Sequence, residues 1–295
     1  MVWALLVLFA VVFAVHYWEY SRSIQEYTFA QPPGPETDMR TVLSEKTPVI
    51  MELGKLPWRP SVAEKAPWSV QIAYDDTDTD TNTTGVRNVS IGAWIADGPT
   101  RKPLLNSEAL AQQIDIPTGL AELDTGRAWW WLAGFQDCAV NILPADGWLG
   151  LSWVTAERQW IGCSHGAPLK VWLAHSRYRP FLPARPNGVV NPWTVTVAEA
   201  PWLGRVQYME VLVHPGWCLG LPAHWGWAVT VAPGPGVEAE AEGEAEAKAK
   251  TEAESWYWLA SQHSPLSMGF AVYQDLMTKR VQVRTESLSS ESVVQ

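Results

Sequence analysis

The six histidines are the first residues to test for chemistry, because a mononuclear iron(II) oxygenase needs two histidines and one carboxylate on one face of the metal. The histidines are His16, His165, His175, His214, His224 and His263. The residues two positions after each of them are Trp18, Ala167, Arg177, Gly216, Gly226 and Pro265. None of these is acidic, so the sequence contains no His-x-Asp or His-x-Glu pair that could supply two of the three ligands.

The cysteines offer a second route to a metal. Cys163 and His165 have the spacing C-x-H, and with His175 or Cys218 they could hold zinc. Structural zinc sites usually show a closer pair such as C-x₂-C. Together with Cys138 the chain has three widely spaced cysteines, which is not a disulfide framework. We expect free, buried thiols that pack as small hydrophobic side chains.

An acidic loop invites comparison with a calcium site. It reads Asp-Thr-Asp-Thr-Asp-Thr-Asn from Asp76 to Asn82. An EF-hand loop requires glycine at its sixth position and glutamate at its twelfth. Counted from Asp76, those positions hold Thr81 and Arg87. The pattern therefore predicts a solvated loop.

Two strands and a tight turn are predicted in the segment from Glu210 to Val231, which reads EVLVHPGWCLGLPAHWGWAVTV. Pro215 and Gly216 supply the fixed and the permissive φ angles that a tight turn between two apolar runs requires. A hairpin is expected there, and a third apolar run follows a Pro-x-x-Trp sequence.

This closing pattern resembles the last strands of the JmjC-like cupins. In that family it reads strand, Pro-Gly-Asp, strand, Pro-x-Gly-Trp-Trp-His, and the final histidine binds iron. Here Trp217 stands at the Asp position and Trp227 at the histidine position. The residues that carry the scaffold signature are Pro215, Gly216, Pro222, Trp225 and Trp227.

The resemblance extends over residues 41–231. The run SEKTPVIMEL (44–53) is similar to the family's opening Lys-Pro-Val-Val-Ile strand, and residues 129–164 correspond to its central region. In that alignment Glu157 stands where the family has the lysine that helps to hold 2-oxoglutarate. The resemblance implies a mainly β fold, the double-stranded β-helix of cupins and jelly rolls, with a few helices. Because the metal and cosubstrate positions depart from the family pattern, we expect no metal, no cofactor and no catalytic residue.

A non-standard iron site remains an alternative. His224 lies three positions before Trp227 and could replace the missing histidine, with His214 and Asp146 as the other candidates. A shift of three positions along a strand moves a side chain to the opposite face, so a turn would have to redirect it.

The N-terminus predicts a membrane anchor at residues 1–20. Residues 1–15 are all apolar, and no charge occurs before Glu19. A span needs about 20 mostly apolar residues, and Tyr17, Trp18 and Tyr20 fall where an interfacial aromatic belt would lie. A cleaved signal peptide usually begins with a basic region, which is missing here. The flanking charges leave the orientation open, and the sequons at Asn82 and Asn88 matter only if the domain is lumenal.

The rest of the chain divides by composition. We predict a linker at 21–39, a β domain at 40–284 with a low-complexity insertion at 233–254, and a disordered tail at 285–295. Helices are expected at 40–46 and 106–114. Strands are expected at 48–53, 68–74, 89–96, 128–133, 149–156, 159–163, 169–174, 193–198, 206–213, 218–221, 227–231 and 256–260.

Charge and tryptophan content limit the classes of function that can be expected. The net charge is -10, and four Asp at 75–80 with the insertion account for nearly all of it, so the remaining body is close to neutral. Nucleic-acid binding needs a basic stripe and is not expected. Most of the 19 tryptophans are expected to pack in the core, and an exposed sugar-stacking face is the alternative.

We therefore expect a membrane-anchored, catalytically inactive cupin-like domain that serves as a structural or protein-binding module. Its partners would be a membrane and an unidentified protein. Large DNA viruses carry anchored virion proteins of this general type, so a virion membrane is one expected setting. The alternatives are a 2-oxoglutarate-dependent iron(II) hydroxylase with an unusual ligand set, and a carbohydrate-binding domain that uses tryptophan faces.

Overall fold

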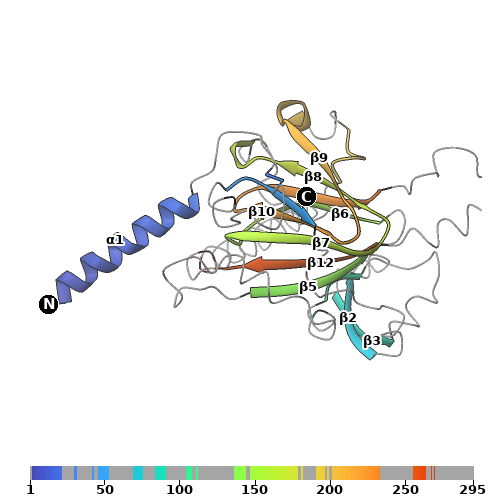
Figure 1. Cartoon of the computed structure of the whole chain (residues 1–295), viewed down its shortest axis with the longest axis horizontal. Helices are drawn as coiled ribbons and strands as arrows, with labels where there is room; N and C mark the ends of the chain where they lie inside the picture. The colour runs from blue at the N-terminus through green and yellow to red at the C-terminus, as the bar shows by residue number, and fades with distance from the viewer. Residues whose placement is uncertain are drawn as a thin grey trace, which may run out of the picture.

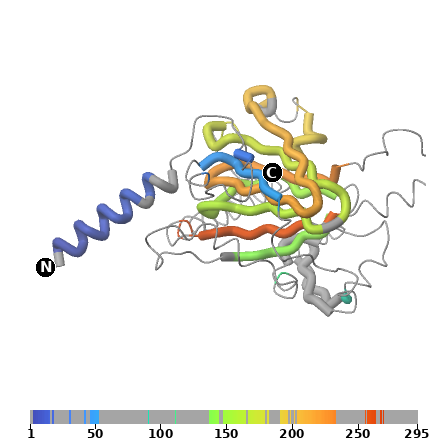
Figure 2. Tube along the Cα trace, viewed as in Figure 1, coloured from blue at the N-terminus to red at the C-terminus, as the bar shows by residue number. Residues whose placement is uncertain are grey.

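The computed structural model describes part of the chain (Figures 1 and 2). The described residues are 2–21, 30–31, 42, 46–52, 69–75, 84–90, 104–107, 111, 136–143, 147–178, 181, 191–196, 198, 201–232, 255–263, 267 and 269.

Two antiparallel sheets form a β-sandwich, so the protein is mainly β as expected. The large sheet has the order β1-β10-β7-β12-β5-β4, and the small sheet has the order β6-β11-β8-β9. The large-sheet strands are β1 (Val49–Glu52), β4 (Leu104–Ser107), β5 (Gln136–Leu143), β7 (Arg158–Gly166), β10 (Trp217–Pro222) and β12 (Ser255–Gln262). The small-sheet strands are β6 (Trp148–Trp153), β8 (Leu169–Ala174), β9 (Tyr208–Val213) and β11 (Gly226–Val231).

The remaining elements lie outside these two sheets. Strands β2 (Ser69–Asp75) and β3 (Thr84–Ser90) form a separate two-stranded ribbon. The helix α1 (Val2–Ser21) precedes the sandwich and projects away from it (Figure 1). Two short 3₁₀ helices, η3 (Ser176–Tyr178) and η4 (Pro201–Arg205), lie in the connection from β8 to β9.

The pairing of the last eight strands is nested. β5 pairs with β12, β6 with β11, β7 with β10 and β8 with β9. All these pairs are antiparallel, so the starts of β5, β7, β9 and β11 meet the ends of β6, β8, β10 and β12 at one end of the sandwich. We call this the His224 end, because His224 lies in its β10–β11 connection, and we call the opposite end, with the β9–β10 turn, the His214 end.

The interior between the sheets is apolar. Alternate residues of each strand point inward, as strand geometry requires. The inward residues from the large sheet include Ile161, Cys163, Leu219, Leu221, Tyr257 and Leu259. Those from the small sheet include Leu169, Val171, Leu173, Val213, Trp227 and Val229. Both inner faces are therefore packed against each other.

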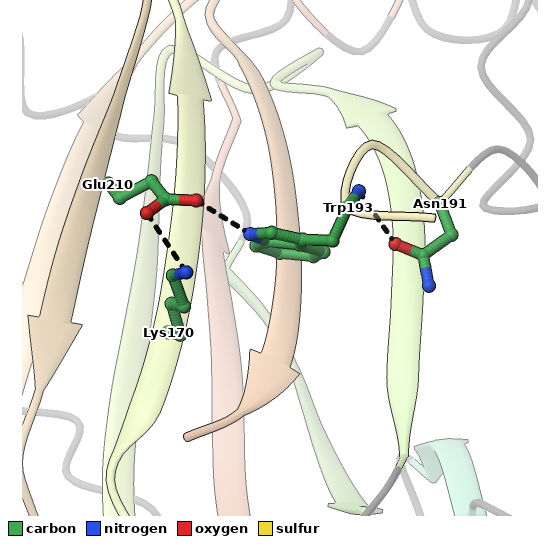
Figure 3. Close-up of polar contacts among 4 residues, drawn as sticks. All are labelled: Lys170, Asn191, Trp193 and Glu210. Atoms are coloured by element: carbon green, nitrogen blue, oxygen red, sulfur yellow. Dashed lines mark hydrogen bonds and ion pairs between the residues drawn. The ribbon is translucent and has the colours of Figure 1, made fainter. Parts of the chain in front are cut away.

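The outer face of the small sheet is also covered. Trp172, Ala228 and Leu151 are buried there against Val206, with Trp153, Tyr178 and Trp193 alongside. Figure 3 shows the polar contacts at this cover: the Trp193 indole donates to Glu210 at 2.8 Å, and Lys170 pairs with the same carboxylate at 2.9 Å. The connection from β8 to β9 thus supplies a second, smaller core.

The strand expected at 193–198 is wrong. Residues Trp193 and Thr194 lie in a turn, and no strand is assigned in the described part of that range. The cause is Asn191, whose side-chain oxygen accepts the Trp193 amide at 3.0 Å while its carbonyl accepts the Val195 amide at 3.1 Å. An asparagine that bonds its own following backbone favours a turn over a sheet ladder.

The other predicted strands and helices are confirmed in part. The strands at 48–53, 68–74, 149–156, 159–163, 169–174, 206–213, 218–221, 227–231 and 256–260 are confirmed within a few residues. β4 and β5 were not predicted, and the helix expected at 106–114 is wrong at its start, since Asn106 and Ser107 lie in β4. The run 128–133, the insertion and the C-terminal tail lie outside the described residues, as do most of 40–46 and of 89–96.

The helix α1 confirms the helical part of the N-terminal prediction. Most of its described apolar side chains are exposed, with Trp3 at 80% and Phe9 at 70% of their full accessibility. Within the described part of the chain, no helix combines the length and apolarity needed to cross a membrane.

Two glycines make room for tryptophans on the outer face of the large sheet. Gly162 pairs across the ladder with Trp258, and Gly220 pairs with Trp160. A Cβ at Gly220 would lie 2.6 Å from the Trp160 ring, and a Cβ at Gly162 would meet the Trp258 ring still more closely. Both rings are fully buried, so neither can easily move aside.

Gly162→Ala should therefore destabilise the protein. We expect a loss of about 2 kcal/mol or more in the free energy of unfolding, because overpacking a filled core costs roughly 1–3 kcal/mol. Equilibrium urea unfolding measures it. Gly269→Ala is the matched control, since nothing lies within 4 Å of a Cβ there. Equal effects of the two substitutions would contradict the packing described for Trp258.

Candidate functional site

The closing segment that carries the family resemblance joins the two sheets. β9 belongs to the small sheet and β10 to the large sheet, so the hairpin expected there is wrong: the two strands do not pair with each other. The Pro215-Gly216 turn is confirmed. Gly216 has a φ of 85°, which favours glycine, and its amide donates to the Cys163 carbonyl at 2.9 Å. The turn carries the chain across the sandwich at the His214 end.

At the other end of β10, the chain crosses back. The Ala223 amide donates to the Glu157 carbonyl at 3.1 Å, and the His224 amide donates to the Val154 carbonyl at 2.8 Å. His224 has a φ of 69°, a left-handed conformation that is uncommon for a residue other than glycine. Pro222 and Trp225 flank this crossing and are buried.

Trp227 is the residue that the resemblance aligns with the family's iron-binding histidine. Its side chain is 3% exposed and belongs to the interior cluster, together with Val229 and Leu173. β11 pairs on both sides, with Ser152 and Leu173 opposite Trp227, so its direction is set by the register. An indole has no lone pair for a metal, and this part of the interior is filled by apolar groups.

The candidates for a non-standard iron site are not brought together. His214 lies in the turn before β10 and His224 in the turn after it, so the six-residue strand separates them by about 20 Å. Asp146 lies outside the described residues. Among the residues that are described, no group of three or more His, Cys, Asp or Glu is close enough to hold a metal ion.

The three cysteines form no disulfide, and Cys163 and Cys218 point to different faces of the large sheet. Cys163 faces the interior, and its thiol donates to the Ala167 carbonyl at 3.7 Å. Cys218 is next to the inward Leu219 and so points to the outer face, where burial raises the pKa of its thiol. A protonated thiol is a poor metal ligand. The expectation of free, buried thiols is confirmed for Cys163 and Cys218, whereas Cys138 is half-buried.

His175 is a packed side chain at the end of β8. It is buried, its ring meets the Trp225 ring edge-on at 4.9 Å between centroids, and its Nδ1 accepts the Arg177 amide at 3.0 Å. A nitrogen that accepts a backbone amide carries no proton, so this imidazole is held as the neutral Nε2–H tautomer.

The His224 end also holds a histidine between two carboxylates. His263 Nε2 lies 3.4 Å from the Asp137 carboxylate, and Glu157 is near enough to interact with it electrostatically. Its Nδ1 is buried and has no hydrogen-bond partner among the described residues. Burial lowers the pKa of His263, and attraction by Asp137 and Glu157 offsets only part of that effect. Glu157, which the resemblance aligns with the family's lysine, thus interacts electrostatically with an imidazole that resists protonation.

One further pattern has the spacing of a serine nucleophile. Residues 162–166 read Gly-Cys-Ser-His-Gly, which matches the G-x-S-x-G signature. That signature requires a sharp turn from a strand into a helix, with the serine exposed at its tip. Here Ser164 lies within β7, which leads through a short turn into another strand, β8. The structural context of a nucleophile is therefore missing at Ser164.

Comparison with known proteins leaves the fold and site to be interpreted on their own geometry. No protein-family model matches the chain, and no curated protein matches it. The JmjC-like resemblance therefore stays a prediction.

The lowered pKa of His263 predicts acid sensitivity. As pH falls below about 6.5, the ordinary value for histidine, the unfolded chain takes up this proton before the folded chain does. The contribution of His263 to stability is therefore present above that pH and is lost as pH falls toward the lowered folded-state value. The expected result is a falling melting temperature between neutral pH and about pH 5.

His263→Gln should flatten this part of the pH profile, because glutamine does not titrate. His214→Gln, at an exposed turn position, is the matched control for replacing a histidine by glutamine. Differential scanning calorimetry across the pH range measures both. A His263→Gln protein with the unaltered profile would show that another group controls the acid sensitivity.

Proposed function

We propose that this protein is a JmjC-like cupin that lacks an iron site, is held at a membrane by α1, and acts as a structural or protein-binding module. The observation that carries the proposal is the buried Trp227, which stands where the family's iron-binding histidine would be and fills the interior beside Leu173 and Val229.

The nested strand pairing supports the cupin part of the proposal. Eight strands, β5 to β12, pair first with last and so on inward, and they divide equally between two facing sheets. This is the arrangement expected when one long antiparallel ribbon is wound into a jelly roll. The connection before β7, which contains Glu157, and the connection before β11, which contains His224, both lie at the His224 end.

The residues at that end support the absence of iron and 2-oxoglutarate chemistry. In the proposed alignment Trp227 replaces a ligand, and Glu157 replaces the lysine that would neutralise the cosubstrate carboxylate. A carboxylate at that position repels the anion instead. What remains is a sandwich whose exposed end residues could contact another protein.

The helix α1 supports a membrane anchor. Apolar side chains occupy every face of its first four turns, so it has no polar side to present to water. A helix that is apolar all round is stable when it is buried in protein or in lipid. Among the described residues, its large apolar side chains, including Leu5, Leu8 and Phe13, remain exposed. Embedding α1 in a bilayer would remove that surface from water.

The decisive experiment measures metal and cosubstrate binding on the full-length protein. The protein is purified in mild detergent without oxygen, supplied with iron(II), and assayed for iron content and for saturable 2-oxoglutarate binding. We expect neither stoichiometric iron nor saturable binding, and an active JmjC-like oxygenase treated in parallel is the control. One equivalent of iron together with saturable 2-oxoglutarate binding would contradict the proposal and favour an enzyme.

A further inference from the structure

One stretch of the chain departs from its acidic character. No Asp or Glu occurs from Arg158 to Ala198, while five basic residues do: Arg158, Lys170, Arg177, Arg179 and Arg185. The whole chain has a net charge of -10, so this segregation creates a locally positive region.

The structure gathers part of this region with aromatic side chains at the His224 end. Arg177 and Tyr178 lie on η3, Phe181 lies in the turn that follows it, Arg205 ends η4, and Tyr208 begins β9. We call these five residues the basic-aromatic patch. Arg177 and Arg205 are exposed. Phe181 is 43% exposed and Tyr208 is 48% exposed.

Contacts within the patch hold its side chains in place. The Arg177 guanidinium donates to the Tyr178 hydroxyl at 2.9 Å and to the Gln207 side chain at 3.3 Å, which ties η3 to the residue before β9. Tyr208 stacks on the buried Trp172 at 5.4 Å between ring centroids. On β9 the next acidic residue, Glu210, is already paired with Lys170, so it neutralises little of the patch.

Chain connectivity places the anchor and the patch toward the same end of the sandwich. Ala30 forms a bridge with Val49 at the start of β1, which pairs with Gly220 in the half of β10 nearer the His224 end. Only residues 22–29 connect α1 to Ala30, and they can reach at most about 30 Å. β9 leads into β10 through the turn at the His214 end and contacts it. The start of β9 therefore lies at the His224 end, as the end of β10 does. In Figure 1 the His224 end, marked by the arrowhead of β12, faces α1.

We propose that the basic-aromatic patch binds the headgroups of anionic phospholipids in the membrane that holds α1. This inference rests on the proposed anchor. Guanidinium groups pair with phosphate through two parallel hydrogen bonds, and tyrosine and phenylalanine suit the boundary between headgroups and acyl chains. Each arginine near an anionic surface strengthens binding by about fivefold. The patch would fix which end of the sandwich faces the lipid.

The test uses full-length protein in lipid nanodiscs of phosphatidylcholine alone and of phosphatidylcholine mixed with phosphatidylserine. Hydrogen–deuterium exchange is followed in peptides that cover 176–181 and 201–208. We expect slower exchange in the anionic discs than in the neutral ones, and loss of that difference at about 1 M salt, where charges are screened within about 3 Å. Peptides of the β2–β3 ribbon should exchange equally in both.

Arginine substitutions test whether the charge of the patch produces the lipid-dependent protection. Arg205→Gln should weaken the lipid-dependent protection by about fivefold, and Arg177→Gln with Arg205→Gln should remove most of it. Arg87→Gln, on the β2–β3 ribbon, removes the same charge elsewhere and should leave the protection intact. Equal exchange in neutral and anionic discs would overturn the patch while leaving the anchor standing. Protein that elutes apart from both kinds of disc would overturn the anchor and, with it, the patch.

Discussion

The packing of two sheets around an apolar interior is the constraint on which the other features depend. Burying the inner faces requires mostly apolar residues at alternate positions of the facing strands, and the register then determines which residues point inward. Trp227 is held in this way by β6 on one side and β8 on the other. A slip of one residue in the register of β11 would move the Trp227 side chain to the outer face, together with the other inward-facing side chains of that strand. The indole is therefore part of the fold.

The same constraint directs polar chemistry to the ends of the sandwich. The outer face of the small sheet is covered by its own apolar cluster, and on the large sheet Trp160 and Trp258 lie across glycines and are buried. Among the described tryptophans, five are almost wholly removed from water: Trp160, Trp172, Trp225, Trp227 and Trp258. This supports the expectation that tryptophan serves packing more than ligand stacking. The His224 end keeps the titratable cluster of His263, Asp137 and Glu157 and the basic-aromatic patch, so any partner contact is best sought there.

Local patterns predicted much of the fold, and non-local pairing explains most of what they missed. Alternating or continuous apolar runs located β8, β10 and β11 because burial leaves a strong signal in short strands. β5 reads QDCAVNIL, with polar residues at its start, and only its place between β12 and β4 makes it a strand. The turn at Trp193 depends on the Asn191 side chain, and the assumed hairpin at Pro215 failed because sequence cannot tell a turn within one sheet from a crossing between two. At the site, the sequence alone showed a tryptophan in place of a histidine at position 227. The proximity of His263 to Asp137 and Glu157 could not be predicted, because it depends on the alignment of three strands.

The stability cost of removing the Trp227 side chain tests the central claim most directly. Trp227→Ala should lower the free energy of unfolding by about 3–5 kcal/mol, since the vacated volume lies in a filled interior. Trp148→Ala is the matched control, because that indole is 36% exposed on the small sheet, and it should cost about 1 kcal/mol or less. Urea unfolding followed by far-ultraviolet circular dichroism measures both. A large loss for Trp227 alone is the predicted result. Similar small losses for the two would mean that the interior around Trp227 is open, as a ligand-binding barrel would be, and would contradict the account.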